Sequence, residues 1–274
     1  RKRARPEDGG EVTFEPDIVG PSAIAHSDRH VTPRALTEAE IQDVIGSFVA
    51  ATRRADAAGF DAVELHGAHG YLLHQFLSPV ANHRADRYGG DAAKRMRLFL
   101  EVAEAVRAAL PAGKALFVRV SGDDQAGVGI EQIVALAREL KAVGVDVIDC
   151  SSGGMREDMK DIPGINPDDY GYQVGYAAAV RKGADIAAMA VGHIIHADQA
   201  EAILRDGKAD LIALGREILY NPNWAMDAAQ KLGEDPDFML VPENLRYYLA
   251  SRRRRLKGVP STYGARMPEP MPAN

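Results

Sequence analysis

The chain has 274 residues, 46% of them hydrophobic, and a formal net charge of −6. This length and composition allow a large core within one α/β domain, and the acidic balance argues against a nucleic-acid-binding or membrane-surface protein and for one that handles small molecules. The single cysteine, Cys150, excludes a disulfide framework and a cysteine-rich cluster made by this chain alone, so we expect a protein of the reducing cytoplasm.

Residues 1–36 show little hydrophobic periodicity and contain many prolines and glycines, which predicts an irregular segment. The first ten residues, RKRARPEDGG, lead into an acidic, turn-rich stretch rather than the apolar core of a signal peptide. The chain contains no run of about 18 apolar residues, the length needed to span a bilayer. We therefore expect neither a targeting signal nor a membrane-spanning segment.

From Thr37 onward, short apolar runs alternate with segments of helical periodicity. The first helix is predicted over residues 37–59, where Thr37 and Glu40 have the spacing of a capping box and Gly59 provides a stop. Strands of nearly continuous apolar character are predicted at 60–67, 115–122, 145–153, 186–192 and 209–215. Further helices are predicted at 91–110, 130–144, 173–182 and 197–207. This alternation is typical of a parallel sheet whose strands are connected by helices.

The C-terminal part of the chain differs in composition from the rest. After NPNWAMDAAQKLG, the sequence continues through a basic segment, LRYYLASRRRR, into a proline-rich end. We assign residues 1–235 to one barrel domain and residues 236–274 to a basic, proline-rich tail whose end we expect to be flexible.

The sequence HGAHGYLLHQF, residues 66–76, places three histidines and a tyrosine directly after the first predicted strand. His66, His69 and His74 could present imidazoles to zinc, but no further ligand follows in register, so we predict no metal. Each could instead be a packed or solvated structural residue, an interpretation that we favour for His74. Active sites form where barrel strands end, which favours His66 and His69 as paired hydrogen-bond donors to one substrate oxygen. Tyr71 is then placed to donate a proton, or else packs in the short helix that follows.

Two further features indicate a ligand. Arg119 lies within the apolar strand LFVRVS, where a buried guanidinium needs a partner. That partner is predicted to be an anionic or electron-rich ligand ring, an ion pair with Glu64, or both. Gly192 and Gly215 end the last two predicted strands, and Arg216 adds positive charge. Because backbone NH groups at such turns bind anions, and the phosphate site of barrels commonly follows the last two strands, we predict a phosphate site here.

Several longer motifs resemble one family. These are HGAHGYLLHQFLSPVANHRADRYGGDAAKRMRLF, FVRVS, DVIDCSSGG, GYQV, AVGHI and LIALGREILYNPNW, and they are similar to the old yellow enzyme family of FMN-dependent ene-reductases. The resemblance spans roughly residues 19–232, and the His-x-x-His form is most similar to the thermophilic-like bacterial branch. It implies a TIM (β/α)8 barrel, of which strands four to eight are recognisable in this chain. Strands one to three are not recognisable, so either the chain is a fragment, or another chain or segment supplies these strands, or they are replaced in a way that the sequence does not predict.

The resemblance also implies a role for each candidate residue. His66 and His69 would bind the carbonyl oxygen of an enone-type substrate, and Tyr71 would be the proton donor. Arg119 would contact the pyrimidine edge of FMN. The cofactor's phosphate would be held by Gly192, His193, Gly215 and Arg216. NADPH or NADH would reduce the flavin, which would then reduce the activated C=C bond of an α,β-unsaturated carbonyl compound.

The family further implies a homo-oligomer, in which LRYYLASRRRR could reach the site of a neighbouring subunit or could simply form a solvated basic face. In a second interpretation, the chain descends from this family but has no enzymatic activity. Without strands one to three, the chain would lack flavin contacts and would leave two strand edges open. It would then be a catalytically incompetent remnant that acts as a binding or structural partner. Bound yellow flavin distinguishes the two interpretations.

Overall fold

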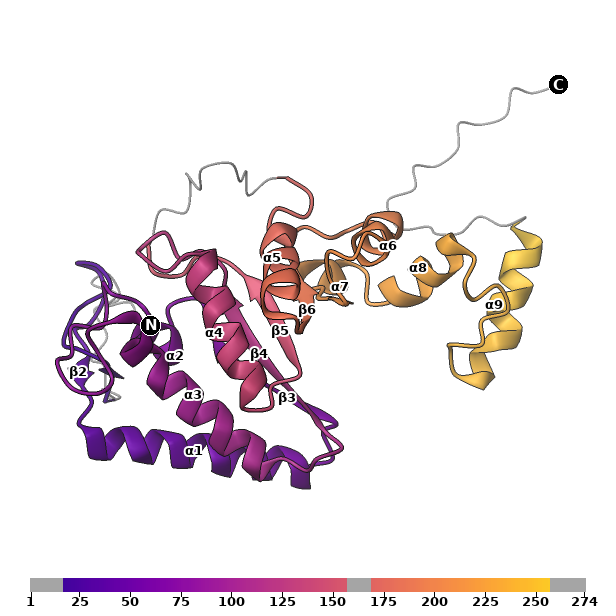
Figure 1. Ribbon diagram of the computed structural model, residues 1–274. Helices are drawn as coiled ribbons and strands as arrows, with labels where there is room; N and C mark the ends of the chain where they lie inside the picture. The colour runs from indigo at the N-terminus through magenta and orange to yellow at the C-terminus, as the bar shows by residue number, and fades with distance from the viewer. Residues whose placement is uncertain (1–16, 157–168, 257–274) are drawn as a thin grey trace, which may run out of the picture. The chain divides into compact units, whose positions relative to one another are not determined.

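The computed structural model describes residues 17–156 and 169–256. Its largest sheet is parallel and has five strands (Figure 1). In spatial order these are β3 (Ala62–Gly67), β4 (Ala115–Ser121), β5 (Val147–Ser151), β6 (Ala187–Ala190) and β7 (Leu211–Ile212). Each of the five strands predicted from the sequence is present and lies beside the next one along the chain. The α/β fold class is therefore confirmed.

The chain forms two compact units. The first comprises residues 1–193 and 206–213, and it contains the whole sheet. Its helices are α1 (Glu38–Ala57), α2 (Leu72–Leu77), α3 (Ala92–Ala109), α4 (Ile130–Ala142) and α5 (Val174–Ala184). The second comprises residues 194–205 and 214–274. Its helices are α6 (Ala197–Arg205), α7 (Arg216–Tyr220), α8 (Trp224–Leu232) and α9 (Glu243–Arg255).

The two faces of the sheet differ in chemistry. Residues paired in register on neighbouring parallel strands project to the same face. The buried face, against which helices such as α5 pack (Figure 1), carries the row Leu65, Val118, Ile148 and Ala188. The opposite face carries the row His66, Arg119, Asp149 and Met189. The charged residues that the sequence places inside apolar strands thus share one face.

Helix α1 begins as the sequence predicts. The Thr37 side chain accepts a hydrogen bond from the Glu40 NH group, and the Glu40 carboxylate accepts one from the Thr37 NH group, which completes the capping box. The helix is joined to α3 through the buried Tyr88. Its hydroxyl accepts from Gln42 at 2.9 Å and donates to Glu101 at 2.8 Å.

The N-terminal segment is less irregular than the sequence predicts. Two short strands, β1 (Val19–Gly20) and β2 (Arg34–Ala35), pair in parallel within it. Two residues are too few to produce an alternating pattern, so the sequence carries no signal for them. Residues 1–16 lie outside the described part of the chain.

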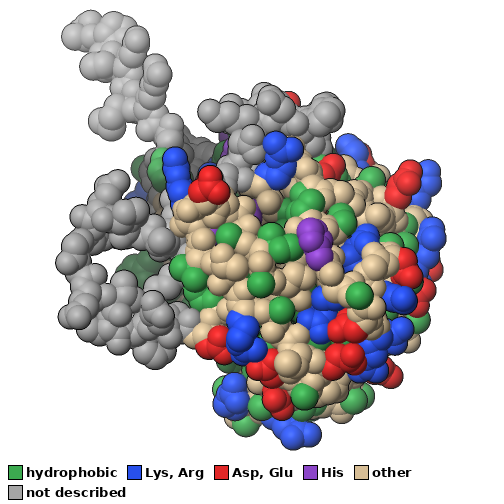
Figure 2. All heavy atoms as spheres, turned by 90° about the vertical axis from the view of Figure 1, so that its left-hand side faces the viewer, with side chains coloured by type: hydrophobic (Ala, Val, Ile, Leu, Met, Phe, Trp, Pro, Cys, Tyr) green, Lys and Arg blue, Asp and Glu red, His purple; other side chains and the backbone are tan. Residues whose placement is uncertain are grey.

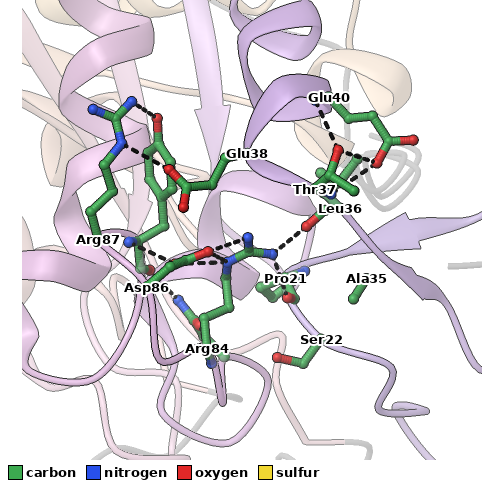
Figure 3. A network of polar contacts seen from close by, with 12 residues as sticks. Pro21, Ser22, Ala35, Leu36, Thr37, Glu38, Glu40, Arg84, Asp86 and Arg87 are labelled. Carbon is green, nitrogen blue, oxygen red and sulfur yellow. Dashed lines mark hydrogen bonds and ion pairs between the residues drawn. The ribbon is translucent and has the colours of Figure 1, made fainter.

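A network around Arg84 fastens this segment to the loop that follows α2 (Figure 3). One terminal nitrogen of Arg84 donates to the carbonyl oxygens of Pro21 and Leu36, at 3.0 and 2.5 Å. The rest of the guanidinium binds the Asp86 carboxylate and holds the pKa of that carboxyl below its usual value. The Arg84 side chain is only 9% exposed. The stretch HRADRYGG therefore joins segments that are distant in sequence.

The second unit is built around the contact between α6 and α8. The indole NH of Trp224 donates to the carbonyl oxygen of Ile195 at 2.7 Å, which fixes the start of α8 against the segment before α6. The basic part of the predicted tail is the helix α9, none of whose residues is buried. The proline-rich end of the tail lies outside the described residues.

The surface that carries the N-terminal segment shows charged side chains of both signs interspersed with hydrophobic ones (Figure 2). Among the described residues, no helix combines the length and the apolar character needed to cross a membrane.

Candidate active site

The structure brings His66, His69 and Tyr71 together at the carboxyl end of β3. The ring centroid of His66 lies 5.2 Å from that of His69 and 5.0 Å from that of Tyr71. Tyr71 is the N-cap of α2, yet its side chain makes no capping hydrogen bond and is 49% exposed. Two imidazoles and an accessible phenol therefore meet where a barrel strand ends, the usual place for catalytic groups in this architecture.

His69 is held by the ends of two neighbouring strands. Its backbone is left-handed, with φ +56°, and its NH group donates to Ser121 Oγ at 3.1 Å. Its ring Nε2 lies 2.8 Å from Ser151 Oγ. Gly154 packs against the same turn so closely that a Cβ atom there would come within 2.2 Å of His69 Cα. The position of this imidazole is thus set by β4 and β5 as well as by its own loop.

His74 lies in the core, in agreement with the structural role that we favoured. Its Nδ1 accepts a hydrogen bond from the Gly70 NH group at 2.9 Å, so the ring proton is on Nε2, which lies 3.4 Å from Asp124 Oδ2. Asp124 Oδ1 accepts from the NH groups of Ala126 and Val128. This buried pair joins the turn before α2 to the loop after β4.

Arg119 projects from the polar face of the sheet, but its ion-pair partner is not the one expected. Its Nε lies 3.2 Å from Asp149 Oδ2, whereas the sequence suggested Glu64. The reason is register, because Asp149 pairs with Arg119 across β4 and β5 while Glu64 pairs with Phe117. Burial raises the pKa of the Asp149 and Glu64 carboxyls, and the Arg119 charge opposes this rise in both.

His66 stands next to this charged group and responds to it. Desolvation lowers the pKa of His66, and the positive charge of Arg119 lowers it further. A neutral His66 can still donate one hydrogen bond, which is what a group that polarises a carbonyl oxygen requires.

The residues predicted to bind phosphate fall in both units. Gly192 and His193 are in the first, with φ +107° and +47°, and the His193 ring lies 5.4 Å from that of Tyr172. Gly215 and Arg216 are in the second, where Gly215 is the N-cap of the five-residue helix α7 and Arg216 is exposed. Of the two glycines only Gly192 needs to be glycine, because side chains rarely adopt its φ of +107°, whereas Gly215 has φ −106° and open space where a Cβ would be.

A cavity of about 620 Å³ opens beside Tyr71. Its walls come from the N-terminal segment, from α2 and from the loops that follow β4 and β5, and they are mainly apolar. Ile24, Val31 and Leu72 are among the lining residues. Sequence reasoning missed this cavity because it had treated residues 17–36 as an irregular connection.

Sequence reasoning also missed the polar partners of the predicted residues. Asp149, Ser121 and Ser151 lie at or near the ends of β4 and β5, and a serine that ends a buried strand was the available signal. In the described residues no three His, Cys, Asp or Glu side chains are grouped so that they could hold a metal ion. Cys150 is buried, as expected for a small apolar residue, and burial raises the pKa of its thiol.

Known proteins resemble this chain in sequence and in fold. An NADPH dehydrogenase of Listeria welshimeri is 43% identical over 228 residues, which cover 82% of this chain and 65% of that protein. Morphinone reductase in complex with tetrahydroNAD is 27% identical, with a TM-score of 0.64, and the match covers 79% of this chain and 60% of that one. The old yellow enzyme homologue from Zymomonas mobilis is 27% identical, with a TM-score of 0.64, over 78% of this chain and 61% of that one.

These matches confirm the predicted fold, because the five parallel strands and their helices correspond to part of a TIM barrel. The chain spans about two thirds, 65%, of the length of the Listeria welshimeri relative. Residues 6–235 match the sequence profile of the NADH:flavin oxidoreductase / NADH oxidase family. The chain therefore belongs to the NADH:flavin oxidoreductase / NADH oxidase family, to which the old yellow enzyme resemblance pointed.

Proposed function

We propose that this chain carries the substrate-activating half of an FMN-dependent ene-reductase, which reduces the C=C bond of α,β-unsaturated carbonyl compounds with NADPH or NADH. The observation that carries the proposal is the cluster of His66, His69 and Tyr71, with ring centroids 5.2 and 5.0 Å apart at the carboxyl end of β3. Two hydrogen-bond donors and one proton donor are what such a reduction needs from the protein.

Each member of the cluster has a separate task. His66 and His69 bind the carbonyl oxygen of the substrate, which draws electron density away from the β-carbon. FMN, when bound, supplies the hydride that the β-carbon accepts. The O–H bond of Tyr71 then breaks and its proton goes to the α-carbon, so that hydride and proton together saturate the C=C bond. The phenol's 49% exposure supports this task, because a proton donor must be reachable by the substrate.

The polar face of the sheet suits a flavin. Arg119 projects from this face, and its Nε lies 3.2 Å from Asp149 Oδ2. We assign to its guanidinium the pyrimidine edge of FMN, an electron-rich group that a guanidinium recognises well. In the first unit we assign an anion-binding role to Gly192 and His193, and in the second unit we assign one to Gly215 and Arg216. The left-handed backbone at Gly192 and His193 supports this assignment, since such turns expose NH groups to anions.

The role of Tyr71 is tested by a substitution that keeps the ring and removes the proton. With Tyr71→Phe, we expect oxidation of the reduced enzyme by cyclohexenone to slow by about 10²–10⁴-fold, because that is the typical contribution of one general acid. Reduction of the enzyme by NADPH should keep its rate. Tyr170→Phe, at another exposed tyrosine, serves as the matched control. An unchanged rate with cyclohexenone in Tyr71→Phe would contradict the assignment.

A second candidate function is a non-catalytic partner of another chain. The described sheet favours it in one respect, because its five strands end at β3 on one side and at β7 on the other. In this alternative the chain keeps the fold and binds no flavin. Our proposal includes the opposite outcome, in which a neighbouring chain or segment completes the barrel in a homo-oligomer of the cytoplasm.

A further inference from the structure

A buried polar chain runs from α5 to the ring of His69. Gln173, the N-cap of α5, directs its amide nitrogen to Ser152 Oγ at 2.6 Å and to Ser151 Oγ at 3.3 Å. Ser151 Oγ in turn lies 2.8 Å from His69 Nε2. Gln173, Ser151 and Ser152 are 3–4% exposed, so water does not compete freely for these atoms.

We propose that Ser151 is a positioning residue that sets the ring tautomer of His69, while Gln173, as a donor, offers the Ser151 hydroxyl no competing acceptor. In this arrangement Nε2 accepts a hydrogen bond and Nδ1 carries the proton. The tautomer determines which ring atom of His69 can donate a hydrogen bond to a substrate oxygen, a step that rests on the proposed function.

The direction of the hydrogen bonds follows from donor chemistry. The amide nitrogen of Gln173 can only donate, so Ser151 Oγ accepts from it. The buried Ser151 hydroxyl must donate its own proton, and of its two partners here only the imidazole nitrogen can accept. His69 Nε2 is therefore an acceptor. In a neutral imidazole the proton is then on Nδ1.

The backbone keeps the ring in place for this interaction. Ser121 holds the NH group of His69, and its hydroxyl donates to the carbonyl oxygen of Gly153 at 2.7 Å. Gly192 leaves space for the Gln173 amide, because a Cβ at that position would lie 2.8 Å from Gln173 Oε1. A side chain at Gly192, which we also predict to lie at a phosphate site, would therefore displace the Gln173 amide.

Two substitutions at one position separate this proposal from a packing role. In Gln173→Glu the side chain becomes an acceptor, so the Ser151 hydroxyl turns toward it and Ser151 Oγ accepts from His69 instead. The proton of His69 should move from Nδ1 to Nε2. In Gln173→Met, which has a similar size and no donor, the Ser151 proton still goes to His69 Nε2. The wild-type tautomer should persist there.

The measurement is the long-range ¹H–¹⁵N spectrum of the histidine rings in the full chain without flavin, with the His69 signals assigned by their loss in His69→Asn. We expect predominantly the Nδ1–H tautomer in the wild type and in Gln173→Met, and predominantly Nε2–H in Gln173→Glu. A wild type with Nε2–H would overturn the proposal, as would identical ring signals in all three proteins.

Ser151→Ala covers the case in which a buried glutamate prevents folding. It removes the donor to Nε2, so His69 should lose its single tautomer and give mixed signals. Unchanged His69 signals in this variant would also overturn the proposal.

Titration with phenol, a simple oxygen ligand, tests the proposed function separately. If the flavin-loaded protein binds phenol, Gln173→Glu should bind it about tenfold more weakly, the equivalent of one hydrogen bond. If the tautomers change as expected but no variant binds flavin or phenol, the proposed control of the His69 tautomer is confirmed and the proposed function is wrong.

Discussion

The charge of His66 is controlled by its neighbours on the sheet. The residue is paired in register with Arg119, which is paired with Asp149. A protonated His66 would therefore lie beside the permanently charged guanidinium of Arg119. Desolvation is the largest cause of the lowered pKa of His66, and the charge of Arg119 adds to it. At neutral pH the ring is therefore mainly uncharged and carries a single proton. Such a ring suits a hydrogen-bond donor to a carbonyl oxygen better than a general acid that gives its proton away.

This charge control predicts a pH dependence. We expect the pKa of His66, measured by NMR titration, to lie below the ordinary value of 6.5 and to rise in Arg119→Gln, because one lowering charge is removed. It should stay below 6.5 in that variant, since desolvation persists. Arg53→Gln, at an exposed arginine, is the control. An unchanged pKa in Arg119→Gln would show that the two residues are not coupled.

The same shift has a consequence for stability. A histidine whose pKa is lower in the folded state than in the unfolded state binds protons more tightly when unfolded. The contribution of His66 to the free energy of unfolding is therefore fully present above pH 6.5 and is lost as the pH falls through 6.5 toward the folded pKa. Replacement by Gln should flatten the pH dependence of Tm in this range.

At the residue scale, the sequence could place His66, His69 and Tyr71 at one strand end, because their spacing and the apolar run before them are local signals. It could not identify Asp149 as the partner of Arg119, because that pairing depends on the register between two strands 30 positions apart. The sequence favoured a structural His74 but left open whether it is packed or solvated, because its buried partner Asp124 comes from another loop.

At the element scale, close packing of β3 against α3 constrains the strand. A Cβ atom at Gly67 would lie 1.9 Å from the ring of Phe99, whereas a Cβ at Gly46 in α1 would meet nothing within 4 Å. Gly67 is the last residue of β3 and Gly46 lies within α1, so alanine at the two positions compares a crowded site with an open one.

We therefore predict opposite effects of the same substitution. Gly67→Ala should lower the free energy of unfolding by about 1–3 kcal/mol, because an overpacked core must shift. Gly46→Ala should raise it by about 0.5–1 kcal/mol, because alanine favours the helix and restricts the unfolded chain. Urea denaturation monitored by circular dichroism measures both. Destabilisation of similar size in the two variants would contradict the packing explanation.

The Arg84 network makes a second prediction for the elements. Arg84→Ala removes the donor to Pro21 and Leu36 and leaves Asp86 without its cation. We expect the free energy of unfolding to fall by about 2–3 kcal/mol, because buried acceptors lose their partner. Arg53→Ala, at an exposed position, should change it by less than about 0.5 kcal/mol. Equal effects of the two substitutions would show that the network does not hold the N-terminal segment.

The elements themselves could largely be predicted. Each apolar run of the first unit became a strand, because parallel strands buried on both faces need continuous hydrophobicity. The capping box of α1 is an equally local signal. The strands β1 and β2 and the cavity beside Tyr71 could not be predicted, since they depend on how Arg84 and its partners hold residues 17–36 against α2 and the loop that follows it.

At the scale of the whole molecule, the family assignment rests on a match over residues 6–235 and on a relative that is 43% identical. The structure supplies the geometry for one part of the proposed reaction, the activation and protonation of the alkene. The contacts to FMN are proposed for Arg119 and for the turn at Gly192 and His193. The proposed reaction therefore depends on flavin binding by this chain.

The most direct test is the visible absorption spectrum of the purified chain after incubation with FMN and removal of unbound flavin. We predict retained flavin whose absorption bleaches on anaerobic addition of NADPH and returns on addition of cyclohexenone. A protein that retains no flavin under these conditions would contradict the proposed ene-reductase function and would favour a non-catalytic partner of another chain.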